Sequence, residues 1–305
     1  MRRLLKLFLG ILIVLISLPL TLHISSEIII ASLTRQAQDT DLFAVSTMEV
    51  GGVMWAFRDY NSEAERVLVI VHGFMGSSYD FHLLSTELNE ELDVRIIAVD
   101  LPGFGQSDKT LDYLYTSHNH AVQLGLFLEQ LEVHSYTLAG HSMGGDVVIR
   151  HSALFPTQVE RLILIAAAGL DGGGAAEALS IAFYDYIFTN YWAQRFGVNT
   201  ATSNNLTRSQ FHPYIIQNAA IPGATIQKFS LNRDTGGNAA LLADISMPTL
   251  ILYGDEDSWT PPSLGERLHE GISDSTFILL EGLGHLPYLE DIATFKSPIL
   301  NFLSE

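Results

Sequence analysis

The stretch Gly140-His141-Ser142-Met143-Gly144-Gly145 decides the fold of this chain. A short apolar run, Tyr136 to Ala139, precedes it, and apolar residues at helical spacing follow it. A serine at a sharp turn between a strand and a helix, with glycines two positions before and after, forms a nucleophile elbow. The strained apex brings the two flanking positions close together, so side chains there would collide. The stretch therefore predicts an exposed nucleophilic hydroxyl at Ser142.

The composition limits the chemistry open to the chain. Its 305 residues, 48% of them hydrophobic, suffice for one large core with room for an inserted subdomain. It has no cysteine, which excludes disulfides, a thiol nucleophile, thiolate metal sites and a lipid anchor through cysteine. Three of its 16 basic residues precede Glu27, so the rest of the chain carries 13 against 34 acidic residues. We expect such an acidic body to repel nucleic acid.

The N-terminus predicts a membrane segment. After Arg2, Arg3 and Lys6 the chain is uncharged up to Ser26, which is long enough for a helix across a bilayer. Cleavage of a signal peptide requires small residues one and three positions before the cut, and the candidates here meet this requirement poorly. An uncleaved anchor is therefore favoured over a cleaved signal peptide. The candidate pairs are Ser26 with Ile24, and Ser25 with His23. The basic flank predicts a single-pass protein of the cell membrane with its body on the extracytoplasmic side, or a secreted protein if the segment is cleaved.

Short apolar runs alternate with amphipathic stretches from about residue 47 onward. The runs predicted as strands are Glu49–Trp55, Val67–Val71, Val94–Val99, Tyr136–Ala139, Leu162–Ala166, Thr249–Tyr253 and Thr276–Leu280. Helices are predicted near 79–91, 114–131, 143–155, 263–270 and 290–303. This alternation predicts an α/β fold, a mainly parallel sheet with helices on both faces, and ligands at the carboxyl ends of the strands.

The alternation is interrupted after Leu170. Asp171 and a triple glycine, Gly172 to Gly174, lead into a segment crowded with aromatic residues, and the strand pattern returns only at Thr249. We expect an inserted helical cap over the strand ends, hinged at the triple glycine, with one or two aromatic rings lining an apolar pocket. The predicted divisions are an anchor or signal peptide at 1–26, a tether at 27–46, a core at 47–170 and 241–305, and a cap at 171–240.

A serine hydroxyl needs a base, and in this architecture the acid and then the histidine follow the serine along the chain. His285 lies in a glycine-flanked loop just past a predicted strand, so it is the predicted general base. Asp257 is the predicted acid because it stands farthest beyond the strand that ends at Tyr253. The acid orients the imidazole and stabilises its charged form. Asp255, Glu256 and Asp171 stay open as rivals for this role.

Attack on a carbonyl creates an oxyanion, which needs donors held in place beforehand. One predicted donor is the backbone N–H of Met143, directly after the nucleophile. The other is the N–H of Phe74, in the glycine-containing loop after Val67–Val71. The Phe74 ring is expected to wall the acyl pocket. His72 is expected to buttress this loop, since the chemistry needs only one base.

These residues together resemble the α/β-hydrolase-fold serine hydrolases, over about residues 47–303 apart from most of the cap. Four motifs carry the resemblance in order, namely His72-Gly73-Phe74, the loop Asp100–Ser107, the elbow at Ser142, and the Gly-x-x-Asp and Gly-x-Gly-His motifs at Asp257 and His285. The Asp100–Ser107 loop is typical of cap-bearing lipases and esterases, epoxide hydrolases, haloalkane dehalogenases and carbon–carbon bond hydrolases. Epoxide hydrolases and dehalogenases carry aspartate at the elbow, so Ser142 argues against both. The elbow is similar to that of monoglyceride lipases and some bacterial lipases.

The expected function is cleavage of carboxylic esters through an acyl-enzyme, with no metal or organic cofactor. The expected partners are a small-molecule or lipid ester and the membrane, and not nucleic acid. Two alternatives stay open: a carbon–carbon bond hydrolase of the meta-cleavage type, which uses the same triad, and an inactive binding module. The cap has few basic residues, which counts against the anionic substrates of the first alternative.

Overall fold

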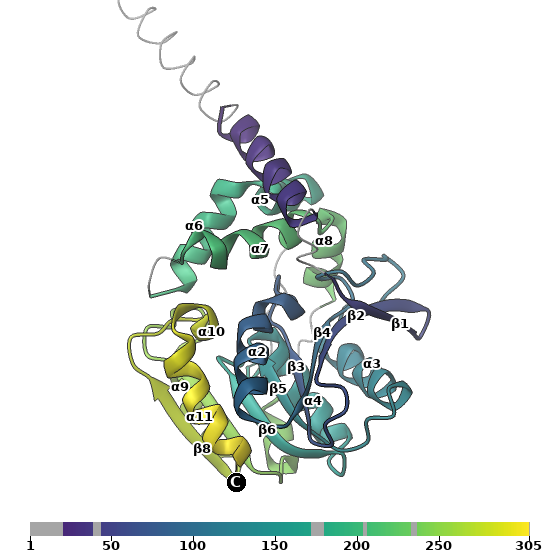
Figure 1. Cartoon of the computed structure of the whole chain (residues 1–305), viewed down its shortest axis with the longest axis vertical. Helices are drawn as coiled ribbons and strands as arrows, with labels where there is room; N and C mark the ends of the chain where they lie inside the picture. Colours follow the sequence, from purple (N-terminus) through teal and green to yellow (C-terminus); the bar gives the residue numbers. More distant parts are fainter. Residues whose placement is uncertain (1–20, 39–43, 172–179, 204–205, 233–236, 305) are drawn as a thin grey trace, which may run out of the picture.

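A computed structural model describes residues 21–38, 44–171, 180–203, 206–232 and 237–304 of the chain. Its centre is an eight-stranded sheet of order β1-β2-β4-β3-β5-β6-β7-β8 (Figure 1). The strands are β1 (Ser46–Val50), β2 (Val53–Tyr60), β3 (Val67–Val71), β4 (Arg95–Asp100), β5 (Tyr136–His141), β6 (Val159–Ile165), β7 (Thr249–Gly254) and β8 (Ser275–Leu280). The six strands from β4 to β8 in this order are parallel to one another. Strand β2 pairs antiparallel with β4 on one side and with β1 on the other. The predicted α/β class with a mainly parallel sheet is confirmed.

One predicted strand, Glu49–Trp55, is wrong, because the chain reverses in the middle of it. Gly51 and Gly52 have φ values of 60° and 79° and join β1 to β2 as a hairpin. Two residues with positive φ make the two-residue turn that matches the twist of paired strands. The apolar residues on either side of the glycines conceal this turn when the sequence is read as a single run.

Helices cover both faces of the sheet, and each face has its own core. On β3, Val69 and Val71 belong to one apolar cluster, and Leu68 and Ile70 belong to the other. A strand sends alternate side chains to opposite faces, so a strand buried on both faces is apolar throughout. Helices α3 (Ser117–Gln130), α4 (Met143–Leu154) and α9 (Pro262–Gly271) contribute to the first cluster, and α2 (His82–Glu91) and α11 (Ile292–Ser304) to the second. Shorter elements are η1 (Ser78–Phe81), η2 (Ala239–Asp244) and α10 (Pro287–Glu290).

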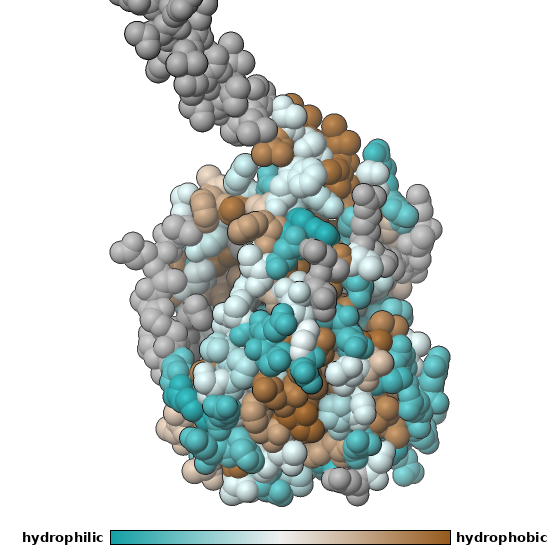
Figure 2. All heavy atoms as spheres, turned by 90° about the vertical axis from the view of Figure 1, so that its left-hand side faces the viewer, coloured by the Kyte–Doolittle hydropathy of each residue, from teal (hydrophilic) through white to brown (hydrophobic). Residues whose placement is uncertain are grey.

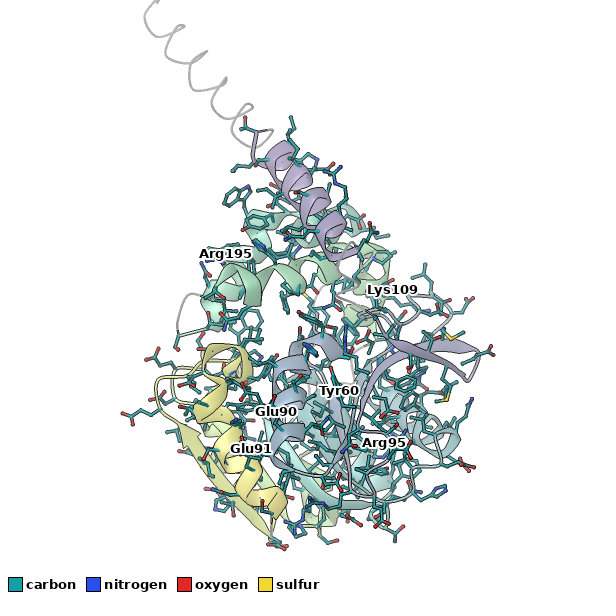
Figure 3. The ribbon with its side chains drawn as sticks, in the orientation of Figure 1. Tyr60, Glu90, Glu91, Arg95, Lys109 and Arg195 are labelled. Carbon is teal, nitrogen blue, oxygen red and sulfur yellow. The ribbon has the colours of Figure 1, made fainter. Side chains whose placement is uncertain are left out.

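Ion pairs connect elements of the core that lie away from the cap. Arg95, labelled in Figure 3, lies on β4 and contacts Asp59 on β2 at two points, Nη2 to Oδ2 at 2.8 Å and Nε to Oδ1 at 3.0 Å. Such a two-point contact fixes geometry as well as adding attraction. Lys296 on α11 contacts Glu87 at 2.8 Å and Glu91 at 2.7 Å, both on α2. These pairs therefore join neighbouring strands and helices of the core.

The cap contains four described helices above the strand ends, α5 (Ile181–Thr189), α6 (Tyr191–Ala201), α7 (Arg208–Ala219) and α8 (Gly223–Leu231) (Figure 1). Asn190 separates the first two, since its side chain accepts hydrogen bonds from the amides of Trp192 and Ala193, both at 3.0 Å, and so begins α6. All four helices fall within the predicted cap, residues 171–240. The predicted hinge, Gly172 to Gly174, lies outside the described residues.

Residues 21–38 form a helix, the N-terminal helix, which lies along the cap (Figure 1). Ser26 Oγ accepts from the Tyr191 amide at 2.6 Å, and Trp192 Nε1 donates to Ser25 Oγ at 3.0 Å. The sequence predicts a tether over 27–46, whereas residues 27–38 are helical. The predicted membrane segment lies mostly outside the described residues. Within the described ranges, no helix is both long and apolar enough to cross a bilayer.

Candidate active site

Ser142 lies at a strained turn between β5 and α4. Its φ of 50° and ψ of −116° place a non-glycine residue in a rarely populated region. A Cβ on Gly140 would meet the Gly144 carbonyl oxygen at 2.5 Å, and a Cβ on Gly144 would meet the His72 carbonyl oxygen at 2.6 Å. Both glycines are therefore required by the backbone that surrounds them. The turn leaves the serine at the start of α4, where the helix dipole is positive.

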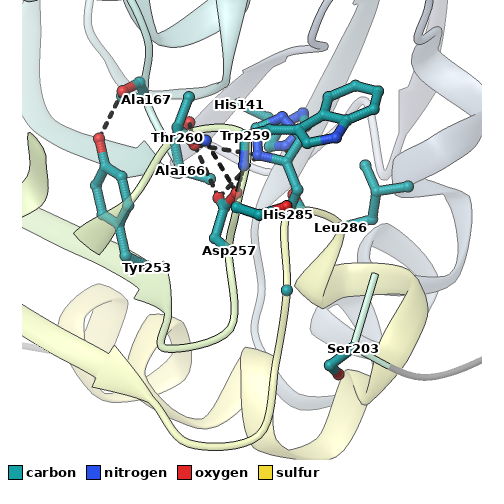
Figure 4. A network of polar contacts seen from close by, with 12 residues as sticks. His141, Ala166, Ala167, Ser203, Tyr253, Asp257, Trp259, Thr260, His285 and Leu286 are labelled. Atoms are coloured by element: carbon teal, nitrogen blue, oxygen red, sulfur yellow. Dashed lines mark hydrogen bonds and ion pairs between the residues drawn. The ribbon is translucent and has the colours of Figure 1, made fainter. Parts of the chain in front are cut away.

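His285 and Asp257 form a buried pair at the same end of the sheet. His285 Nδ1 lies 2.8 Å from Asp257 Oδ2, and these side chains are 4% and 0% exposed (Figure 4). Asp257 Oδ1 accepts from the amides of Trp259 at 2.8 Å and Thr260 at 2.9 Å. The Thr260 hydroxyl lies 2.8 Å from Asp257 Oδ2 and 3.1 Å from His285 Nδ1. Asp257 thus has a full set of donors around it.

These donors keep Asp257 ionised. Burial opposes the charge, but the hydrogen bonds from His285 and Thr260 outweigh it and lower the pKa of Asp257 below its ordinary value. A carboxylate accepts and does not donate, so Nδ1 of His285 carries the proton in this contact. In the neutral imidazole with its proton on Nδ1, the lone pair is on Nε2, which is the form that a general base requires.

The three rival acids lie elsewhere. Asp255 is exposed and accepts from the Gly282 amide at 2.7 Å. Glu256 is also exposed. Asp171 is held at two points by Arg267, both at 2.6 Å. Among the four candidates, Asp257 is the one whose carboxylate contacts His285 in the described part of the chain.

His141 joins the base loop to the nucleophile turn. Its Nε2 donates to the His285 carbonyl at 2.8 Å, and the two rings lie 4.8 Å apart. Burial, followed by the neighbouring His285, holds the pKa of His141 well below its ordinary value, so this ring is neutral. Since His141 directly precedes Ser142, the contact brings the His285 loop close to Ser142. Within the described residues the Ser142 hydroxyl makes no hydrogen bond to His285, and such catalytic contacts are often long in free enzymes.

The loop after β3 lies beside the nucleophile. A Cβ on Gly73 would stand 3.1 Å from the Cβ of Ser142, so the backbone that leads to the Phe74 amide passes next to the serine. His72 donates from Nδ1 to the Gly73 carbonyl at 2.7 Å and accepts at Nε2 from the Leu101 amide at 3.0 Å. Both ring nitrogens are occupied, and burial lowers the pKa of His72. This geometry is that of a buttress for the loop.

The Phe74 ring reaches the cap. Its centre lies 5.1 Å from that of Phe229 on α8 and 5.7 Å from that of Phe104. An aromatic wall therefore spans core and cap next to the elbow. The described residues contain no group of three or more His, Asp or Glu side chains that could hold a metal ion.

A sequence profile of the alpha/beta hydrolase fold family matches residues 66–292. The chain belongs to this family. It is 24% identical over 290 residues to Lipase 3 of Moraxella sp. strain TA144, covering 90% of this chain and 88% of that lipase. It is also 24% identical over 257 residues to a 2-hydroxy-6-oxononadienedioate/2-hydroxy-6-oxononatrienedioate hydrolase of Klebsiella pneumoniae, covering 79% and 88% of the two chains.

Among solved structures, this α/β hydrolase resembles a membrane phospholipase A described as a bacterial virulence factor. The two superpose with a TM-score of 0.74 at 22% identity, over 99% of this chain and 98% of the other. At this identity the likeness shows the fold. The family match and the lipase and esterase relatives together support a hydrolase of the lipase and esterase kind, as the motifs predict.

The sequence motifs of this α/β hydrolase do not include three side chains that lie around His285. They are His141, which holds the His285 carbonyl, Thr260, which contacts both Asp257 and His285, and Glu290, which lies five residues beyond His285. His141 stands next to the nucleophile, and Thr260 follows the acid closely, so position along the chain was a usable signal for both. Nothing in the sequence near Glu290 indicates the direction of its carboxylate.

Proposed function

We propose that this α/β hydrolase cleaves carboxylic esters through a covalent acyl-enzyme on Ser142. The observation that carries the proposal is the buried His285–Asp257 pair, held by His141 directly beside the strained turn at Ser142. An imidazole whose Nδ1 is held by a carboxylate, next to a serine hydroxyl, is the arrangement that activates a weak nucleophile.

In this mechanism the Ser142 oxygen attacks the ester carbonyl carbon while His285 Nε2 takes the hydroxyl proton. The Phe74 and Met143 amides stabilise the oxyanion, and each such donor is worth roughly 10²- to 10³-fold in rate. The protonated His285 then gives its proton to the departing alcohol, which leaves the acyl group on Ser142. Water attacks the acyl carbon with His285 again taking a proton, and collapse releases the acid and restores the serine. Asp257 stays ionised and stabilises the imidazolium in both halves.

The apolar surface of the cap favours esters with apolar acyl chains, presented at a membrane. Large exposed apolar side chains gather on the N-terminal helix and the cap: Leu22, Ile24, Ile28, Ile181, Phe183, Tyr186, Trp192, Phe196 and Leu231. Figure 2 shows brown apolar atoms at this end of the molecule. The uncharged sequence from Leu7 to Ser26 leads into the same helix. We place the enzyme on the extracytoplasmic side of the cell membrane, with the cap toward the bilayer, and as a secreted enzyme if the segment is cleaved.

A second candidate function is hydrolysis of a carbon–carbon bond in a dienoic keto acid, favoured by the similarity to the Klebsiella hydrolase. The substrates named for that relative are dianions and need cationic partners. In the cap of this chain, Arg195 already stacks over the Phe211 ring at 4.8 Å. Ester hydrolysis is the better-supported function because the cap has few basic residues, Arg195, Arg208, Lys228 and Arg233, and because two lipases are among the relatives.

Turnover of p-nitrophenyl esters of graded acyl length by the full-length protein tests the proposal. We expect turnover that rises with acyl length, and its loss in Ser142→Ala. Ser297→Ala, at an exposed serine on α11, is the matched control and should keep full activity. Turnover that survives in Ser142→Ala would refute the proposal. Inertness to all esters with cleavage of a dienoic keto acid would establish the second candidate. Inertness to both, with no labelling by a fluorophosphonate, would indicate a binding module.

A further inference from the structure

Three successive backbone amides, those of His285 and its two neighbours, donate hydrogen bonds to three different oxygen atoms. The Gly284 amide donates to Glu290 Oε2 at 3.0 Å, and the Leu286 amide donates to Glu290 Oε1 at 3.1 Å. Between them, the His285 amide donates to the Ala201 carbonyl at 2.7 Å. The Glu290 carboxylate on α10 therefore accepts hydrogen bonds from the loop on both sides of His285. The carbonyl of the cap residue Ala201 accepts the hydrogen bond of the His285 amide between them.

The same carboxylate also holds the end of the cap helix α6. Glu290 Oε2 accepts from the Ser203 amide at 2.9 Å and lies 2.7 Å from the Ser203 hydroxyl. That hydroxyl is also 2.6 Å from the Gly282 carbonyl, at the start of the base loop. A Cβ on Gly284 would lie 2.7 Å from the Ala201 carbonyl oxygen and 2.8 Å from the Ser203 nitrogen, so cap backbone and loop backbone are in direct contact. Figure 4 shows Ser203 beside this loop, below the labelled side chains of His285 and Leu286.

The chemistry of Glu290 suits this task. Two carboxylate oxygens offer about four acceptor positions, and charge-assisted hydrogen bonds are roughly twice as strong as neutral ones. Within the described ranges Glu290 forms no ion pair with Lys or Arg, so backbone amides and one hydroxyl receive its charge. A glutamine of the same shape would turn an NH₂ group toward one of these N–H donors. The arrangement therefore requires a carboxylate.

We infer that Glu290 is a positioning residue, which sets the direction of the His285 imidazole and couples the seating of the cap to the triad. This inference rests on the proposed ester hydrolysis. When the cap end at Ala201 and Ser203 is docked, the base loop has its full set of hydrogen bonds. When the cap end lifts, the loop loses the Ala201 acceptor and a partner of Glu290, so the base is released with it. Productive catalysis is thereby tied to a seated cap.

The first experiment compares Glu290→Gln with the wild-type enzyme. We expect kcat for a p-nitrophenyl ester to fall about 10- to 100-fold, because small displacements of a catalytic group are costly, with KM changed less than twofold. Glu281→Gln, at an exposed residue that begins the same loop, is the matched control and should keep kcat. The downfield proton NMR signal of His285 Nδ1–H should broaden or shift in Glu290→Gln and not in Glu281→Gln.

The second experiment tests the coupling to the cap with Ser203→Ala and the double variant. Ser203→Ala should lower kcat about two- to fivefold. If both residues act through one hydrogen-bonded unit, the double variant will be no slower than Glu290→Gln, whereas independent effects would multiply. Multiplying effects would overturn the coupling to the cap.

Two outcomes overturn the positioning role itself. One is a folded Glu290→Gln with unchanged kcat and an unchanged His285 signal. The other is a loss of activity that follows the fall in Tm and disappears when the assay is run well below it. The NMR signal needs no substrate, so the positioning role stays measurable if the wild-type enzyme turns over no ester. That last result counts against the proposed function alone, and an unaltered His285 signal counts against Glu290 alone.

Discussion

The strand ends and the cap differ in how tightly their backbone is packed. At the strand ends, a Cβ on Gly140 or Gly144 would strike backbone atoms within 2.6 Å. In cap helix α6, a Cβ on Gly197 would find no atom within 4 Å. The contrast extends to exposure, since Asp257 and His285 as whole residues are both 3% exposed, whereas Phe196 is 72% exposed.

Under the proposed function, this difference separates two tasks, acyl transfer at the strand ends and contact with the ester chain or a lipid surface at the cap. Acyl transfer requires the catalytic groups to be positioned to within a fraction of an ångström. A close-packed turn fixes their positions in this way, and for the same reason it tolerates few substitutions. Contact with an apolar chain or a lipid surface needs area rather than a fixed geometry. We therefore expect the same kind of substitution to have very different effects in the two regions.

Glycine-to-alanine substitutions should give the largest contrast. In Gly144→Ala the new methyl group meets the Val71 and His72 carbonyl oxygens, which are backbone and do not yield. We expect loss of soluble protein or at least a thousandfold lower kcat/KM, since overpacking here also distorts the elbow. Gly197→Ala lies in a helix with open space, so it should keep activity and raise the free energy of unfolding by about 0.5–1 kcal/mol. Esterase assays and thermal unfolding of the two purified variants measure this.

The next contrast is between two neighbouring aspartates. Asp257→Asn should lower kcat roughly 10³- to 10⁴-fold, because an amide in place of the carboxylate disturbs the tautomer and charge of His285. Asp255→Asn removes a carboxylate that is exposed and bonds the Gly282 amide, so kcat should change less than threefold. Steady-state kinetics with one ester suffice. The reverse ranking would assign the acid to Asp255 and break the match between burial and catalysis.

The buried core should also make the enzyme sensitive to acid. Burial lowers the pKa of four core histidines from the ordinary 6.5: His120 to about 3, His151 to about 4, and His72 and His141 in the same direction. Below about pH 6.5 the unfolded chain binds protons that the folded chain does not, so stability is lost as the pH falls. Each histidine contributes roughly 1.4 kcal/mol per pH unit over its shifted range. Chemical denaturation from pH 7 to 4 should show this slope.

One buried carboxyl group changes the free energy of unfolding with pH in the opposite direction. Burial raises the pKa of Asp80 from 3.8 to about 7, so between these values the folded chain holds a proton that the unfolded chain releases. Its contribution is present at low pH and is lost as the pH rises through about 7. Asp80→Asn should therefore steepen the acid loss of stability, and His120→Gln should flatten it. Ser297→Ala, at an exposed residue without an ionisable group, is the control and should leave the slope unchanged.

The smallest expected effect concerns the exposed cap. Phe196→Ser should leave turnover of a short, soluble ester unchanged and lower turnover of a long-chain ester in phosphatidylcholine vesicles about three- to tenfold, because apolar contact area with the lipid is lost. Leu126→Ser, at a side chain of core helix α3 that is 44% exposed, should leave both activities unchanged. An equal loss on both substrates would place Phe196 in the substrate pocket instead of at a lipid-facing surface.

Most strands of the core sheet could be predicted from the local pattern of apolar residues. The apolar runs that became β3 and β7 are buried on both faces, and such strands are continuous in sequence. The hairpin at Gly51 and Gly52 was missed because an apolar run hides a reversal that only the positive φ values reveal. The helix at residues 21–38 was only partly foreseen, since its contacts with Tyr191 and Trp192 join segments far apart in the chain.

The sequence by itself indicated the elbow, since part of the steric demand for its glycines is local: a Cβ on Gly140 would meet Gly144 and Val148, both within six residues of Ser142. It also named His285 and a short run of candidate acids. Only the tertiary structure decided that Asp257 faces His285, that His141 holds the base loop, and that Glu290 joins this loop to the cap. Local sterics act between neighbours in the chain and so leave a mark in a short motif. The direction of a carboxylate depends on loops from β5, β7, β8 and the cap that meet only after the sheet has formed.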